Sequence, residues 1–531
     1  MDKIKRVFLN LILPGVILSG AIGFIVGFVL FFYKYVWDLI FKNSLYIYEK
    51  IRMNLILIIP GLFILIVFAF IQTQIIKRVP ESRGGGIPTS EGVVRGQLNC
   101  SPTLTCLSTI GLSFISIFVG VPLGSEGPSV LIGTTLSNQL YKFLPKRFKA
   151  YKRYMMTGGA STAFAVATGA PITGILFALE EIHRKFSPMI LLVSISSVLS
   201  GIFIDYALSN KFNVSIAMFE NLNMPVVPLN KVFIFAVVGL VIGILAILFS
   251  KLIELCKDIF DNKTAKINIF YKILSTFIIT FILGLTIKDA LGGGHSLIVG
   301  LFNDKNYSIL MLFLLLGIKF LMIPYASSSG VTGGMFIPIL TIGALIGMLL
   351  AKAFNMEEYK NVFIAVSMVS FMSAAIGCPL SGIVFACEVL SGLNNILPIL
   401  ISVFIAFAIF KATKFNTVYD IVLEGKLKNK YTFRDFVVVD YTFKVNRDSF
   451  ACNKSTRDLL LPPNAIILSI QRSKKDHFKM DNLGDKILHE NDIITLRAQT
   501  YNVDKTENEI EAFFGTQEKL EVEIIQEKKY N

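Results

Sequence analysis

One twelve-residue pattern occurs twice in the chain, as Gly169-Ala-Pro-Ile-Thr-Gly-Ile-Leu-Phe-Ala-Leu-Glu180 and as Gly377-Cys-Pro-Leu-Ser-Gly-Ile-Val-Phe-Ala-Cys-Glu388. Seven of the twelve positions are identical at an offset of 208 residues. Two prolines in glycine-containing turns, Pro128 and Pro338, lie at the similar offset of 210 residues. The sequence therefore predicts two halves of similar construction, about 1–215 and 216–425.

The charges that flank the two copies differ. Six Lys or Arg residues lie within 142–153, before the first copy, and His183-Arg-Lys185 follows it, whereas 361–410 around the second copy contains neither Lys nor Arg. Because cytoplasmic loops are enriched in positive charge, both ends of the first copy are expected on the cytoplasmic side. The second copy would then enter from the opposite face. Such an inverted-topology repeat places a substrate site near the middle of the membrane, between broken and re-entrant helices.

The composition places most of the chain in lipid. Of the 531 residues, 53% are apolar and 17% are charged, which excludes an ordinary soluble enzyme. Apolar runs from Val7–Phe32 to Ile396–Phe410 predict roughly ten to twelve helices that cross or enter the membrane. The basic residues before Val7 indicate a retained first helix with a cytoplasmic N-terminus. We predict an all-α, multi-pass protein, and its Lys-, Ile- and Asn-rich composition, without a targeting peptide, favours a bacterial plasma membrane.

The membrane pattern stops near Gly425. Residues 426–430 predict a linker between a transmembrane domain, 1–425, and a cytoplasmic domain, 431–531. Short β-branched runs separated by turn residues indicate that this second domain is a small α+β module, with strands at 436–445, 465–471 and 493–497.

The basic excess lies in the membrane part. Residues from Lys426 onward carry 18 basic and 17 acidic side chains, so 1–425 holds +13 of the net charge of +14. This excess sets orientation and contacts anionic lipid, and nucleic acid is not an expected partner. The six cysteines have no metal-ligand spacing, and no nucleophile or phosphate-binding loop occurs, so we predict no metal, no cofactor and no enzyme activity.

Three turns that contain glycine and proline lead into apolar helical runs. They are Gly84-Gly-Gly-Ile-Pro88, Gly124-Ser-Glu-Gly-Pro128 and Gly333-Gly-Met-Phe-Ile-Pro338. Such helix starts expose unpaired N–H groups at the positive end of a helix dipole, so several of them meeting at the midplane would hold an anion without a buried cation. A single turn of this kind more often only permits close packing. The combination with the repeat favours an ion site.

Two glutamates stand out in the apolar sequence. Glu126 lies inside one glycine turn, where an ionised carboxylate competes with an anion and a protonated one leaves the site. Glu181 ends the first repeat beside Glu180 and basic residues, where it either carries protons inward or forms an interfacial ion pair. Tyr419, after the last apolar run, would ordinarily be an interfacial aromatic residue. Gly292-Gly-Gly294 suggests a loop.

At these residues the sequence resembles the CLC family of chloride channels and proton-coupled chloride antiporters, from about Ile25 to Leu427. The resemblance implies that Glu126 is the gating glutamate and Glu181 the internal proton-transfer glutamate. Family members are homodimers with one pore per subunit. The anion ligands that the resemblance implies are the amides of Ser125, Glu126, Gly127 and Ile337 at an outer site, the amides of Met335 and Phe336 with the Tyr419 hydroxyl at a central site, and Gly84 and Gly85 at an inner site.

The sequence departs from the family pattern at two positions. Gly85 replaces the usual serine and removes a hydroxyl beside the central anion. Ser125 replaces an arginine, which lowers the positive potential at the outer mouth and predicts weaker anion binding. The segments 459–472 and 483–496 look like the TrkA C-terminal (RCK-C) module of potassium-transport regulators, and this second resemblance implies a small-molecule regulatory ligand on 431–531.

The leading hypothesis is exchange of protons for chloride or a similar small monovalent anion, with Glu126 as gate and Glu181 as internal proton acceptor. The alternative is a passive chloride channel gated by voltage or by a ligand. A cation transporter is disfavoured because no filter of the Thr-Val-Gly-Tyr-Gly type occurs. The remaining class is a purely regulatory or scaffolding membrane protein.

Overall fold

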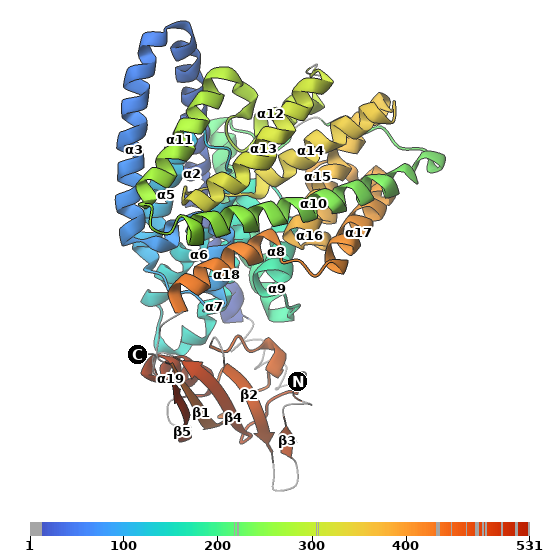
Figure 1. Cartoon of the computed structure of the whole chain (residues 1–531). Coiled ribbons are helices and arrows are strands. Elements are labelled where there is room, and N and C mark those ends of the chain that lie inside the picture. The colour runs from blue at the N-terminus through green and yellow to red at the C-terminus, as the bar shows by residue number, and fades with distance from the viewer. Residues whose placement is uncertain are drawn as a thin grey trace.

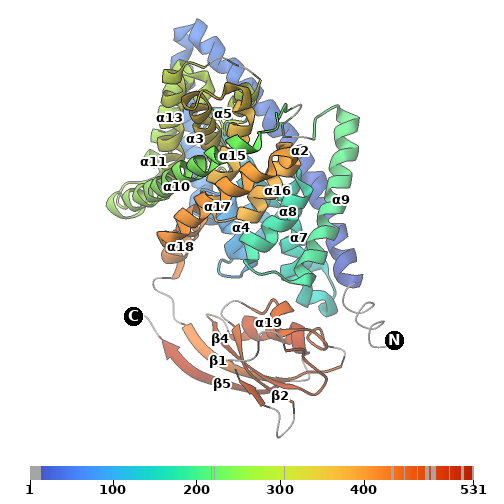
Figure 2. The same cartoon turned by 90° about the vertical axis from the view of Figure 1, so that its right-hand side faces the viewer.

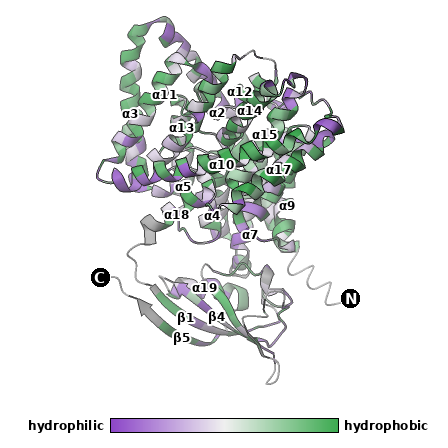
Figure 3. Cartoon of the chain, turned by 45° about the vertical axis from the view of Figure 1, so that its right-hand side comes forward, coloured by the Kyte–Doolittle hydropathy of each residue, from purple (hydrophilic) through white to green (hydrophobic). Residues whose placement is uncertain are grey.

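A bundle of helices stands above a small sheet domain (Figure 1). The computed structural model describes residues 13–216, 218–219, 222–303, 305, 307–431, 436–447, 449–462, 465–472, 477–479, 483, 486–500, 503–515 and 519–528. Within these residues, ten helices are long and apolar enough to cross a membrane, which agrees with the predicted all-α, multi-pass fold. Hydrophobic residues run along these helices, and hydrophilic residues gather at their ends (Figure 3). The basic chain start, 1–6, lies outside the described residues.

Each half contributes a series of helices. The first half contains α2 (Leu13–Met53), α3 (Ile58–Arg78), α4 (Gly86–Val94), α5 (Pro102–Val119), α6 (Glu126–Leu140), α7 (Lys152–Thr168), α8 (Pro171–Phe177), the π-helical turn η6 (Ala178–His183) and α9 (Pro188–Phe212). The second half contains α10 (Ile234–Asp258), α11 (Ile269–Thr286), α12 (His295–Phe302), α13 (Ile309–Ser329), α14 (Phe336–Ala353), α15 (Lys360–Ile376), α16 (Pro379–Val389), α17 (Ile396–Ala412) and α18 (Val418–Tyr431).

The two sequence copies form the same break in each half. Helices α7 and α15 end at Gly169 and Gly377, whose φ angles of 64° and 98° lie in the left-handed region that glycine adopts at little cost. Pro171 and Pro379 then begin the short helices α8 and α16, where a missing N–H costs nothing. The predicted broken helices are therefore present at both copies.

The C-terminal module is the predicted α+β domain. Its five strands are antiparallel in the order β3-β2-β4-β1-β5: β1 (Phe436–Lys444), β2 (Ala465–Gln471), β3 (His477–Lys479), β4 (Ile493–Thr500) and β5 (Lys519–Lys528). Helix α19 (Val503–Phe514) covers the sheet face toward the helical bundle (Figure 2). All three predicted strands are confirmed. The turn residues expected between them fall mostly outside the described residues.

Residues 426–430, predicted as a linker, are helical and continue α18 to Tyr431. The ammonium group of Lys426 donates to the carbonyl oxygen of Arg83 at 2.7 Å and to the Thr89 hydroxyl, which ties the start of this segment to the start of α4.

Candidate functional site

The three glycine turns meet at one place in the helical bundle. Gly124 and Gly334 exchange two backbone hydrogen bonds of 2.7 Å, although 210 residues separate them. A Cβ atom on Gly127 would lie 2.7 Å from the Cα atom of Gly334 and 3.2 Å from the backbone nitrogen of Gly86. Only glycine allows three backbones to approach this closely. The starts of α4, α6 and α14 therefore bring three positive helix ends together.

Glu126 is the first residue of α6, and its side chain is buried. The Ser125 hydroxyl donates to its Oε1 atom at 3.2 Å, and the amides of Glu126 and Ile337 face the same carboxylate. These amides are two of the groups predicted for the outer anion site. The carboxylate of Glu126 therefore faces the backbone amides at the starts of α6 and α14.

The residues predicted around a central anion are buried. Met335 precedes α14, Phe336 begins it, and Tyr419 lies in the first turn of α18. The ring of Phe336 packs against Phe164 and Phe385, with ring centroids 4.9 and 5.8 Å apart. Within the described residues the Tyr419 hydroxyl has no hydrogen-bond partner. Glu126 and Glu181 both lie close enough to act electrostatically on Tyr419.

Glu181 lies in η6 and is 1% exposed. The thiol of Cys378 donates to its Oε2 atom at 3.1 Å, and the Arg184 guanidinium lies 3.6 Å from Oε1. Sequence reasoning missed a second buried carboxylate beside it. Glu91 of α4 pairs with Arg95 at 2.7 Å and with Arg184 at 3.5 Å. The sequence feature that could have identified Glu91 is an acidic residue in an otherwise uncharged helical segment, three positions after Pro88.

Glu180, next to Glu181, has a different environment. Its carboxylate accepts hydrogen bonds from the Leu380 amide at 3.0 Å, from the Ser381 amide at 2.7 Å and from the Ser381 hydroxyl at 2.8 Å, at the start of α16. Glu388 accepts the matching three bonds from Ile172 and Thr173 at the start of α8. The final glutamate of each copy therefore caps the start of the short helix in the other copy. This arrangement makes α8 and α16 antiparallel, as an inverted repeat requires. The shared final glutamate of the two copies was the available signal.

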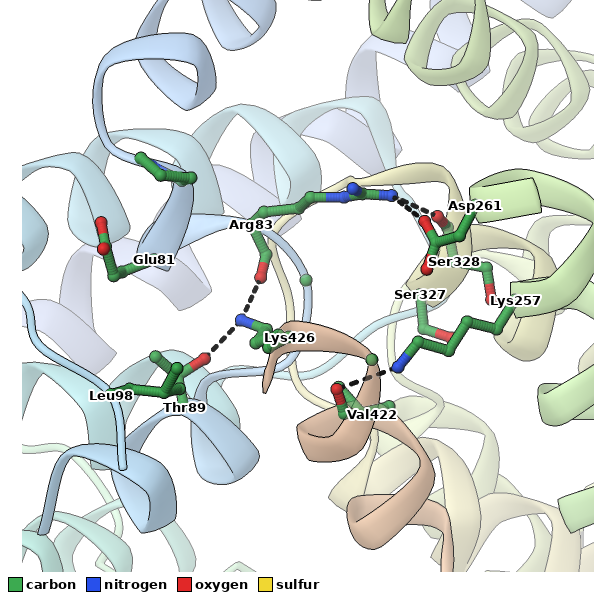
Figure 4. Close-up of a pocket in the computed structure, with 13 residues that line it drawn as sticks. Glu81, Arg83, Thr89, Leu98, Lys257, Asp261, Ser327, Ser328, Val422 and Lys426 are labelled. Carbon is green, nitrogen blue, oxygen red and sulfur yellow. Dashed lines mark hydrogen bonds and ion pairs between the residues drawn. The ribbon is translucent and has the colours of Figure 1, made fainter. Parts of the chain in front are cut away.

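A cavity of about 260 Å³ lies beside Gly84, at the start of α4 (Figure 4). Three cations line it: Lys426, Lys257, whose ammonium group donates to the Val422 carbonyl at 2.9 Å, and Arg83, which pairs with Asp261 at 3.2 Å. Burial, together with the charges of Arg83 and Lys257, lowers the pKa of Lys426 to about 7. Sequence reasoning missed this lysine because it lies 342 residues after Gly84.

A glycine loop, Gly292–Gly294, lies beside the turn that begins α6. Gly292–Gly294 form the predicted loop, and a Cβ atom on Gly293 would lie 3.2 Å from the Cα atom of Gly124, so this loop packs against the α6 turn. The buried Lys319 ammonium group holds the loop by donating to the carbonyls of Ala290 at 2.9 Å and Gly292 at 2.6 Å. No group of three or more His, Cys, Asp or Glu side chains within the described part of the chain could hold a metal ion.

Comparisons with known proteins agree with this architecture. The family model described as voltage gated chloride channel matches residues 67–411. The H(+)/Cl(-) exchange transporters ClcA of Citrobacter koseri and of Salmonella arizonae are each 28% identical over 337 residues, which cover 61% of this chain and 70% of the relative.

Solved structures share the fold. A slow cyanobacterial Cl-/H+ antiporter superposes with a TM-score of 0.70 at 21% identity, over 78% of this chain and 98% of that chain. A CLC-type fluoride/proton antiporter superposes with a TM-score of 0.64 at 22% identity, over 77% of this chain and 97% of that chain. Since the family model matches more than half of the residues and the fold agrees, the chain belongs to the voltage gated chloride channel (CLC) family.

Proposed function

We propose that this protein exchanges protons for chloride, or for a similar small monovalent anion, across the membrane. The observation that carries the proposal is the position of the Glu126 carboxylate on the converging glycine turns. An ionised carboxylate that faces amides at a helix start competes directly with an anion, and a protonated carboxylate can leave the site. The charged carboxylate and the anion are then mutually exclusive at one site, so anion entry is linked to protonation of Glu126, and this link is the condition for coupled transport.

The second buried glutamate favours exchange over a passive channel. A channel needs no internal proton acceptor, yet Glu181 is buried near the Tyr419 hydroxyl. We assign Glu181 as that acceptor and Glu126 as the gate. The names of the ClcA relatives as H(+)/Cl(-) exchange transporters support this choice.

The proposed anion ligands are backbone amides and one hydroxyl. The Tyr419 hydroxyl is a buried donor without a partner in the described residues, a state that costs about 1–3 kcal/mol unless a ligand accepts its hydrogen bond. The other proposed ligands are the amides of Ser125, Glu126, Gly127 and Ile337 outside, Met335 and Phe336 at the centre, and Gly84 and Gly85 inside.

Flux measurements in liposomes test the exchange directly. An outward chloride gradient across proteoliposomes should drive protons inward against their own gradient, and a pH-sensitive dye would report this movement. Chloride efflux without any uphill proton movement would favour the channel, and the absence of anion flux would remove both functions.

Gly85→Ser should strengthen chloride binding. A Cβ atom at position 85 would lie 3.6 Å from the Pro88 side chain and 3.7 Å from the Met335 side chain, which are ordinary contacts. The backbone there, with φ −66° and ψ 130°, suits any residue. A serine hydroxyl beside Met335 would add one hydrogen bond to a central anion, worth roughly 1 kcal/mol or about fivefold in affinity. Isothermal titration with chloride measures the change. Gly85→Ala supplies the volume without the donor, and equal affinities in the two variants would contradict the role of the hydroxyl.

Anion flux should fall as the inner pH rises through about 7. The lowered pKa of Lys426 means that its ammonium group is charged below about pH 7 and neutral above it, so the positive potential at the Gly84 cavity declines with rising pH. The variants are compared in a Glu126→Ala background, so that titration of Glu126 does not contribute to the pH dependence. In this background Lys426→Met should give a low anion flux at every pH, and Lys426→Arg should give a high anion flux at every pH. A pH profile that Lys426→Met leaves unchanged would exclude this role.

We propose a homodimer that uses the face formed by α8, α9, α16 and α17. The short helices α8 and α16 expose Ile172 and Leu380, which occupy equivalent positions in the two copies, and Leu199 of α9 and Phe404 of α17 are also exposed. Broken helices are tolerated at membrane depth only where protein covers them, so this face needs a partner. Light scattering in detergent should give the mass of a dimer, and a monomer would contradict the assignment. We place the dimer in a bacterial plasma membrane, with both termini cytoplasmic.

The C-terminal module, proposed as an RCK-C-like regulatory domain with a small-molecule ligand, contacts the helices next to η6. Glu509 of α19 lies 3.2 Å from the Lys152 ammonium group at the start of α7, and the Ser187 hydroxyl before α9 donates to Asp458 at 2.7 Å. A shift of the module would therefore act on α7 and α9, two helices that contact η6. Glu509→Lys should alter anion flux and Lys152→Glu should restore it, whereas unchanged flux in Glu509→Lys would exclude this route.

A further inference from the structure

The two copies of the repeat differ at a buried position beside Glu181. The second copy carries Cys378 between Gly377 and Pro379, where the first carries Ala170. Both side chains are fully buried. The two halves also differ at the position of Glu181, where the second half carries Val389. The chain therefore places one thiol and one carboxylate at positions where the repeat gives neither group a counterpart, and these two groups form a hydrogen bond of 3.1 Å.

The thiol is the only hydrogen-bond donor to the Glu181 carboxylate within the described residues. Arg184 lies 3.6 Å from Oε1, which is too long for a good hydrogen bond, and it binds Asp420 more closely at 2.6 Å. Arg95 donates to the backbone carbonyl of Glu181 at 2.9 Å and pairs with the carboxylate of Glu91. The cations around Glu181 are therefore engaged mainly by other groups, and Cys378 fixes the orientation of the carboxylate.

We propose that Cys378 is a positioning residue for proton transfer: its S–H group holds the Glu181 carboxylate in its charged form and turns it toward the ion path. This inference rests on the proposed role of Glu181. A thiol is a weak donor, so the carboxylate can take up a proton without breaking a strong bond. Tyr419 lies within electrostatic range of Glu181, Cys378 and Glu126, which supports a route for protons from this pair toward Glu126.

The test compares donors at position 378. Cys378→Ala installs the residue of the first copy, Cys378→Ser keeps a donor, and Ala170→Cys is the matched control in the other half. Proton and chloride fluxes are measured in the same proteoliposomes, so that the anion flux reports folding. Cys378→Ala should lower the ratio of proton to chloride flux by about threefold or more, while Cys378→Ser stays within about twofold of wild type and Ala170→Cys does not change it.

The dependence of proton flux on inner pH is a second readout. Without the thiol donor the charged carboxylate is less favoured, so the profile of Cys378→Ala should move to higher pH. The other titratable and charged groups that face Glu181, which are Glu91, Arg95, Arg184, Tyr419 and Asp420, are the same in all variants.

Three outcomes would overturn the positioning role. They are a wild-type flux ratio and pH profile in Cys378→Ala, an equal loss of coupling in Cys378→Ser and Cys378→Ala, and full coupling in Cys378→Val, which replaces the thiol by a side chain without a donor. Glu181→Gln, measured in parallel vesicles, distinguishes a failure of the Glu181 role from a failure of the Cys378 role. If Glu181→Gln still couples, the proposed function of Glu181 fails; if it uncouples while Cys378→Ala behaves as wild type, only the role of Cys378 fails.

Discussion

Glu126→Ala should leave anion flux in place and reduce uphill proton movement to the background of protein-free vesicles. The carboxylate lies against the amides of Glu126 and Ile337 at the junction of three helix starts. Truncation to alanine removes the competing charge but leaves every amide, so an anion keeps its ligands. The variant lacks the buried carboxylate that accepts the proton at this junction. The ratio of proton to chloride flux, measured with a pH dye and a chloride electrode on the same vesicles, checks this expectation.

Two variants control this prediction. Glu126→Gln keeps the shape of the side chain without a titratable group, so it should also abolish coupling. Ser125→Ala removes only the hydroxyl that donates to Oε1 at 3.2 Å and should preserve coupling. Persistent uphill proton movement in Glu126→Ala would refute the gate.

Glu181→Gln should abolish coupling without a large change in anion flux. The amide has the size of the carboxylate but exchanges no proton with the inner solution. Glu181 lies at the cluster of Glu91, Arg95 and Arg184, and its substitution alters none of the backbone amides of the glycine turns, so these anion ligands stay intact. The same paired flux measurement applies, and wild-type coupling in this variant would exclude Glu181 as the internal acceptor.

The neighbour Glu180 provides a matched control. Its carboxylate caps the start of α16 through three hydrogen bonds, so Glu180→Gln should keep coupling but lower the free energy of unfolding by about 1–3 kcal/mol. Glu388→Gln should lower it by a similar amount, because Glu388 makes the matching three bonds at the start of α8. Thermal denaturation in detergent compares the two variants. Coupling lost in Glu180→Gln but kept in Glu181→Gln would reverse the assignment.

The starts and breaks of the helices follow from local residues alone. Glycine and proline act on their own backbone, so Gly169-Ala-Pro171 and Gly377-Cys-Pro379 predicted breaks that the structure contains. The glycine turns before α4, α6 and α14 were predictable for the same reason. The strands of the C-terminal module followed from β-branched runs, which are also local signals.

Which of these parts meet depends on how the whole helices pack. The Ile337 amide that faces Glu126 is 211 residues away along the chain, Cys378 lies 197 residues from Glu181, and Lys426 lies 342 residues from Gly84. The different environments of Glu180 and Glu181, adjacent in sequence, depend on how η6 turns each side chain against the other half. Such contacts follow from the packing of whole helices, whereas propensity, capping and turn signals extend over only a few residues.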